Sequence, residues 1–183
     1  MSDHPDFHVI TGGPGAGKTT LIAALASRGV AGFPEAGRSI IQAQRTIGGP
    51  AGHDGDRALY AELMLSWDIR SHAEACGLAG PVVFDRGIPD LVGYLQLCGL
   101  VVPAHFIAAA RRFRYARTVF VAPGWEAIYA NDAERRQDFS EARETEAAIR
   151  AAYAGLGYDC IDLPHVPVGA RAEFVLKHCL TNA

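Results

Sequence analysis

The sequence predicts an α/β protein whose parallel sheet of five strands is covered by helices on both faces. Short, β-prone apolar runs alternate with longer segments of helical periodicity along most of the chain. Several of these runs are apolar on both faces, as is typical of strands buried between helices. A glycine-rich segment joins the first apolar run to the first helical pattern, as at the strand-to-helix turn of a βαβ unit.

Each element has a local justification. Phe7–Ile10 is apolar and bounded by turn residues, Gly29 ends the first helix, and Gly80-Pro81 precedes the third strand. The predicted strands are residues 7–10, 30–33, 81–85, 117–123 and 158–164. The predicted helices are residues 17–28, 36–46, 55–76, 88–98, 103–113 and 169–180, and a charged segment spans residues 131–153.

Composition narrows the class of protein. The 183 residues are enough for one domain, residues 1–183, with a substantial core. The net charge of −3 argues against a general nucleic-acid binder, and no apolar run is long enough for a membrane span. The four cysteines form no CxxC pair, which argues against zinc and fits reduced thiols. With no evident signal peptide, we expect a cytoplasmic protein.

The glycine-rich segment matches the phosphate-binding motif GxxxxGK[ST] without a mismatch. The predicted nucleotide-binding residues are Gly12, Gly13, Pro14, Gly15, Ala16, Gly17, Lys18, Thr19 and Thr20. Glycines let backbone N–H groups turn inward and leave no Cβ to block an anion, and the following helix adds its positive end. Lys18 can reach the β- and γ-phosphates, and the Thr19 hydroxyl can bind Mg²⁺.

The expected ligand is a nucleoside triphosphate with Mg²⁺. The dinucleotide pattern GxGxxG fails because Lys18 stands where its third glycine would be. The sequence contains no guanine-reading N/TKxD motif, which favours ATP over GTP without deciding between them.

Two carboxylates follow predicted strands, where ligands of open α/β sheets bind. Asp85 ends the third strand, and we expect it to bind Mg²⁺ with Thr19 rather than to serve only as a turn residue. Glu35 follows the second strand and can accept a proton from an acceptor hydroxyl, or else merely favour a helix N-terminus. Arg38 and Arg86 are candidate substrate contacts, with simple ion pairing as the alternative for each.

Further candidates lie on predicted helices. Asp68 lies in the middle of the predicted helix 55–76 and is a candidate substrate contact. Arg135 and Arg136 open the charged segment near the expected phosphate side. Arginines that close over a transferring phosphate stabilise its transition state, so we expect these two to be catalytic. For Arg143 and Arg150, further along the segment, we favour a solvated, salt-bridged helix.

Four stretches together resemble the AAA_28-type P-loop ATPase domain family: "FHVITGGPGAGKTTL", "FPEAGRSIIQAQ", "VVFDRGIPDLVGYL" and "NDAERRQDFSEA". That family is similar to the kinase domain of bacterial nicotinamide riboside kinase and, more distantly, to nucleoside and nucleotide kinases. The resemblance implies a doubly wound, three-layer P-loop NTPase fold with strand order 2-3-1-4-5, and an arginine-bearing lid at about residues 129–145. It places an acceptor-contacting acid at Glu35 and an acidic-Arg pair at Asp85-Arg86.

These observations predict a Mg²⁺-dependent kinase that transfers the γ-phosphate of ATP to a hydroxyl of a small, nucleoside-like molecule. Lys18, Glu35, Asp85, Arg135 and Arg136 are the expected catalytic residues, with Asp85 as the rival base to Glu35. The alternative is a nucleotide-dependent regulatory ATPase or GTPase, or a binding switch, without a small-molecule acceptor. The sequence predicts neither the acceptor nor the oligomeric state.

Overall fold

The computed structural model describes residues 3–125 and 139–181. The strands are β1 (Phe7–Gly12), β2 (Ala31–Phe33), β3 (Val82–Asp85), β4 (Thr118–Ala122) and β5 (Asp159–Asp162). The helices are α1 (Lys18–Ala26), α2 (Ala36–Ile47), α3 (Arg57–Ala75), α4 (Ile88–Leu97), α5 (Ala104–Arg112), α6 (Phe139–Gly155) and α7 (Val168–Thr181).

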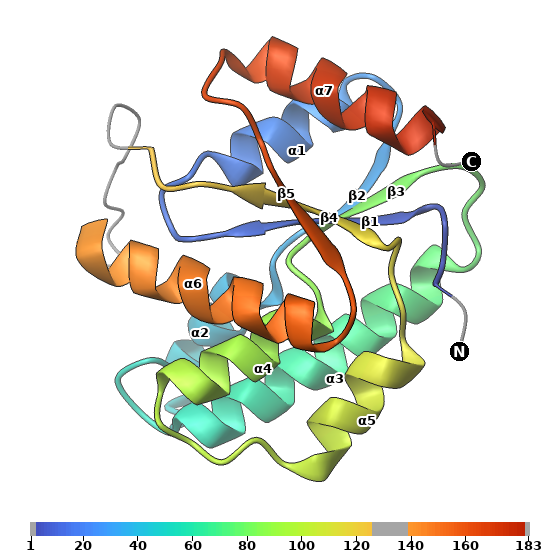
Figure 1. Cartoon of the computed structure of the whole chain (residues 1–183). Helices are drawn as coiled ribbons and strands as arrows, with labels where there is room; N and C mark the ends of the chain where they lie inside the picture. The colour runs from blue at the N-terminus through green and yellow to red at the C-terminus, as the bar shows by residue number, and fades with distance from the viewer. Residues whose placement is uncertain (1–2, 126–138, 182–183) are drawn as a thin grey trace.

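The five strands form one parallel sheet in the order β2-β3-β1-β4-β5. Helices α1 and α7 pack together on one face, and the helices from α2 to α6 cover the other (Figure 1). This is the predicted three-layer α/β/α arrangement with the predicted strand order, and both predictions are confirmed. Because the strands are parallel, their carboxyl ends meet along one edge, where ligands of such sheets bind.

The position of each strand in the sheet follows from its side chains. Central β1 is buried along its whole length, and β3 beside it is equally buried, as their apolar runs predict. Edge strand β5 is mostly half-buried or exposed, and its two ends carry Asp159 and Asp162. Charged side chains on an edge strand discourage pairing with another chain.

Two apolar clusters hold the layers together near the site. Leu21, Leu25 and Val175 join α1 and α7 to one face of the sheet. Phe84 and Tyr153 belong to the cluster that joins the other face to α6. Among the described residues, no helix is both long enough and apolar enough to cross a bilayer.

Candidate functional site

The glycine-rich loop links β1 to α1 and has the backbone that its glycines predict. At Gly12, where φ is 130°, a Cβ atom would lie 2.2 Å from the carbonyl oxygen of Ala122 on β4. Gly17 precedes the first residue of α1 with φ of 77°, in the left-handed region that favours glycine. The loop therefore depends on glycine for both backbone conformation and close packing, and it delivers the N-terminus of α1 to the sheet edge.

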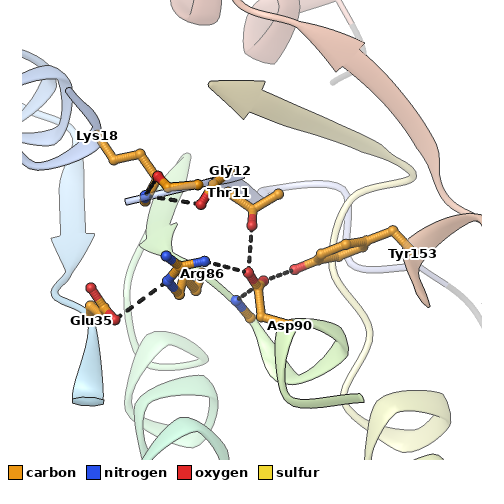
Figure 2. Close-up of polar contacts among 9 residues, drawn as sticks. Thr11, Gly12, Lys18, Glu35, Arg86, Asp90 and Tyr153 are labelled. Carbon is orange, nitrogen blue, oxygen red and sulfur yellow. Dashed lines mark hydrogen bonds and ion pairs between the residues drawn. The ribbon is translucent and has the colours of Figure 1, made fainter. Parts of the chain in front are cut away.

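Lys18 is the first residue of α1, and its side chain is buried. Its Nζ donates hydrogen bonds to the carbonyl oxygens of Gly12 at 3.1 Å and Gly13 at 2.8 Å (Figure 2). The ammonium group thus bonds two loop carbonyl oxygens, which it can exchange for phosphate oxygens. Thr19 and Thr20 follow on the exposed part of the first turn.

Arg171 supports the same loop from the other end of the chain. It lies near the start of α7, is 3% exposed, and donates from Nη1 to the carbonyl oxygen of Ala16 at 3.2 Å. Burial lowers the pKa of its guanidinium group. Sequence reasoning missed this residue, although a charged side chain four positions before the buried Val175 was a usable signal on an amphipathic helix.

A second group of side chains gathers at the same edge of the sheet. A pocket there, closed in this structure too tightly to admit a water molecule, is lined by Phe33, Pro34, Asp68, Ser71, Phe84, Asp85, Arg86 and Tyr115. Glu35 borders it, because its Oε1 lies 3.4 Å from Nε of Arg86. The structure therefore brings together four of the predicted site residues, Glu35, Asp68, Asp85 and Arg86. Arg38 is exposed in the first turn of α2 and is not part of the pocket lining.

Asp85, at the end of β3, is a buried carboxylate with an unusual environment. Within the described residues, its Oδ1 is buried and has no hydrogen-bond partner. Burial raises the pKa of this carboxyl, the charge of Lys18 lowers it, and Glu35 raises it again. A buried carboxylate oxygen without a partner beside a phosphate loop fits the predicted role of a ligand to Mg²⁺ or to metal-bound water.

Arg86 follows Asp85 and adopts a φ of 71°, which is rare for a residue with a side chain. The guanidinium group reaches Glu35 on one side and Asp90 on the other, with 3.0 Å between Nη1 and Oδ1 of Asp90 (Figure 2). Burial lowers its pKa, but the carboxylates of Glu35, Asp90 and Asp85 outweigh burial and raise it. Arg86 is therefore charged and held between two acids.

Asp90 is the functional residue that sequence reasoning missed most plainly. It is 3% exposed, lies in the first turn of α4, and accepts hydrogen bonds from four groups, one of which is the charged side chain of Arg86. Those donors are the Thr11 hydroxyl, Nη1 of Arg86 at 3.0 Å, the Gly87 amide at 3.0 Å and the Tyr153 hydroxyl at 2.6 Å. They come from β1, the turn after β3 and α6, so one carboxylate joins three elements around the site (Figure 2).

The local sequence explains why Asp90 was overlooked. Gly87, Pro89 and Asp90 form a typical helix start, in which an acidic residue at the third position bonds the preceding backbone amide. That signal predicts a cap and no long-range contact. Tyr153 gives no sequence signal at all, because an aromatic residue on a helix is usually core.

Helix α6 packs closely on α4 and has a salt-bridged outer side. A Cβ at Gly93 would lie 3.0 Å from Cα of Ile149, so the two helices are in close contact there. Arg150 binds both Glu146, at 3.0 Å, and Asp162, which confirms the salt-bridged interpretation of this arginine. Arg135 and Arg136 lie outside the described residues, as does most of the predicted lid, so their role stays a prediction.

Metal-binding residues were also predicted. In residues 3–125 and 139–181, three or more His, Cys, Asp or Glu side chains nowhere form a cluster able to hold a metal ion. Mg²⁺ in nucleotide sites commonly takes one or two protein ligands and completes its shell with phosphates and water, so Thr19 and Asp85 stay a prediction.

Comparison with known families is decisive for the class of protein. The model of the AAA domain family, AAA_28, matches residues 7–171, which include the loop and every pocket residue named above. The chain belongs to this family. Sequence comparison with curated proteins found no match.

Solved structures of similar fold include three kinases. The deoxyadenosine kinase of M. mycoides with bound dATP is 13% identical, with a TM-score of 0.60 over 97% of this chain and 100% of that one. The thymidylate kinase of Candida albicans is 10% identical, with a TM-score of 0.66 over 100% and 94%. The shikimate kinase of Acinetobacter baumannii in complex with shikimate is 14% identical, with a TM-score of 0.53 over 97% and 94%. This AAA domain protein therefore has a P-loop kinase fold, the fold of phosphotransferases and NTPases.

Proposed function

We propose that this AAA domain protein is a Mg²⁺-dependent kinase that transfers the γ-phosphate of ATP to a hydroxyl of a small, nucleoside-like molecule. One observation carries the proposal. Asp68, Asp85 and Arg86 line a small pocket bordered by Glu35, and the charge of Lys18 on the phosphate loop acts on Asp85, which supports an acceptor site next to the nucleotide. Hydrolysis needs only a water molecule there, whereas transfer needs a site for the acceptor.

Each residue has a role in this proposal. Lys18 and the loop amides would hold the β- and γ-phosphates, and Thr19 and Asp85 would hold Mg²⁺, which would supply charge neutralisation on the phosphates. Glu35 orients the acceptor hydroxyl and accepts its proton, with Asp85 as the alternative base. Arg86 bonds Glu35 and thereby fixes the position of that carboxylate.

The three kinases of similar fold support a small-molecule acceptor. Their names give deoxyadenosine, thymidylate and shikimate as acceptors, and all three are small hydroxyl- or phosphate-bearing molecules. At 10–14% identity they support the class of reaction and leave the acceptor of this chain open.

The direct test measures ATP consumption with and without a pool of nucleosides, nicotinamide riboside, sugars and aminoglycosides. A kinase consumes ATP faster when its acceptor is present and forms one phosphorylated product. Slow ATP turnover that no acceptor changes would contradict the proposal and favour a regulatory ATPase or binding switch.

A further inference from the structure

The pocket beside the phosphate loop carries more negative than positive charge. Four carboxylates belong to it or border it: Glu35, Asp68, Asp85 and Asp90. Of the positive side chains that the structure describes near them, Lys18 lies on the phosphate loop, Arg86 lies between Glu35 and Asp90, and Arg38 is exposed on α2 outside the pocket lining. The charges of Lys18 and Arg86 are thus already in contact with the loop carbonyls or with carboxylates.

Nucleotide binding does not reverse this balance on the acceptor side. In the proposed function, Lys18 would bind the phosphates, and Asp85 would bind Mg²⁺. What faces the acceptor is then Arg86 between two acids, together with Asp68. Burial, followed by the charges of Asp90 and Glu35, holds the pKa of the Asp68 carboxyl well above its usual range, so Asp68 can be neutral and still leave one net negative charge.

The rest of the pocket wall is uncharged. Phe33 stacks on Phe84 with ring centroids 5.2 Å apart, and Phe84 meets Tyr115 edge to face at 5.2 Å. Ser71 adds one hydroxyl to the lining. Aromatic walls favour a flat, apolar part of a ligand and attract positive charge at their faces, and they offer nothing to neutralise an anion.

We propose that the acceptor carries no anionic group: it is an uncharged or cationic hydroxyl compound, and phosphomonoesters and carboxylates are excluded by charge. This inference rests on the proposed function, because it concerns the same acceptor site. Among the acceptors named for the kinases of similar fold, it favours one like deoxyadenosine over ones like thymidylate or shikimate.

A binding experiment tests this charge preference without depending on turnover. The protein is first saturated with Mg²⁺ and a non-hydrolysable ATP analogue, so that the phosphate loop is filled. Calorimetry then compares nucleosides with their own 5′-monophosphates, aminoglycosides with uncharged sugars, and shikimate as a carboxylate. We expect at least about tenfold tighter binding of a nucleoside than of its monophosphate, since each like charge at contact distance costs about 1 kcal/mol even in water.

A variant that adds a positive charge at the rim of the pocket tests the same preference in the opposite direction. Pro34 is exposed in the pocket lining, and Leu78 is exposed beyond the other end of β3, at the opposite edge of the sheet. Pro34→Arg should narrow the preference for nucleoside over monophosphate by about fivefold, the equivalent of about 1 kcal/mol. Leu78→Arg adds the same charge far from the pocket and should leave the preference unchanged.

The outcomes separate the two proposals. Tighter binding of a monophosphate or carboxylate than of every uncharged or cationic compound overturns the inference, even if the protein transfers phosphate. Binding of an uncharged or cationic compound without transfer from ATP supports the inference and overturns the proposed kinase function. Failure of every compound to bind counts against both.

Discussion

The two halves of the site are built in different ways. The phosphate half comes from one continuous stretch, residues 11–20, in which one buried lysine bonds the backbone of the loop. The acceptor half draws Glu35 from the start of α2, Asp68 from α3 and Asp90 from α4. Arg86 joins them from the turn after β3. A contiguous loop keeps its function through local conformation, whereas an assembled pocket depends on side chains that position one another. Variants in the two halves should therefore fail in different ways.

The largest effect is expected at Lys18. Lys18→Met removes the charge that meets the β- and γ-phosphates, and turnover of ATP should fall by at least about 100-fold, as when an electrostatic donor is removed from a transition state. Lys177, the other lysine of the chain, is exposed on α7, and Lys177→Met is the matched control. Equal turnover in the two variants would remove the loop from the mechanism.

The next largest effect, a loss of stability, is expected at Asp90, whose carboxylate accepts hydrogen bonds from β1, α6 and the turn after β3. Asp90→Asn replaces a buried acceptor of four hydrogen bonds by an amide and leaves Arg86 with one acid fewer. The free energy of unfolding, measured in urea, should fall by about 3 kcal/mol. Tyr153→Phe removes a single donor and should cost about 1 kcal/mol. If both variants cost equally little, Asp90 is a local cap and not a junction.

Asp68 should make stability depend on pH. Its carboxyl pKa is raised by burial first and then by Asp90 and Glu35, so the folded protein holds a proton that the unfolded chain releases near pH 4. The stabilising effect of this proton is present at low pH and is lost as pH rises from about 4 to the raised folded pKa. Urea unfolding across this range should show Asp68→Asn gaining stability over the native chain as pH increases. Parallel pH curves for the two proteins would show that Asp68 is ionised in the fold.

The smallest effect, a modest loss of ATP affinity, is expected at Arg171, whose side chain bonds the phosphate loop. Arg171→Met keeps much of the buried volume but removes the hydrogen bond to the Ala16 carbonyl. ATP should bind about fivefold more weakly, the equivalent of about 1 kcal/mol, because the loop amides are then less well fixed. Calorimetric titration with ATP measures this directly, and unchanged affinity would mean that the loop holds its conformation without Arg171.

The contrast also explains what could be predicted from the sequence. The fold and the loop follow from local signals: apolar runs of strand length, glycines at turns, and one contiguous motif. Glu35 and Asp85 were found because both follow strands, whose carboxyl ends share one edge. Asp90 and Tyr153 lie 63 positions apart, and their contact depends on the packing of α4 on α6, which no local pattern encodes. Arg86 was found from its place after β3, while its two acidic partners emerged only in the structure.

The central claim is that the loop holds the nucleotide while the carboxylates beside it direct the γ-phosphate to an acceptor. Glu35→Gln tests it most directly, with ATP affinity and acceptor phosphorylation measured on the same preparation. We predict ATP affinity within about twofold of the native protein and at least about 100-fold slower transfer, the usual contribution of a general base. Glu62→Gln, on the exposed side of α3 beside His105, is the control for the same chemical change. Transfer at the native rate by Glu35→Gln, or loss of ATP binding together with transfer, would contradict the account.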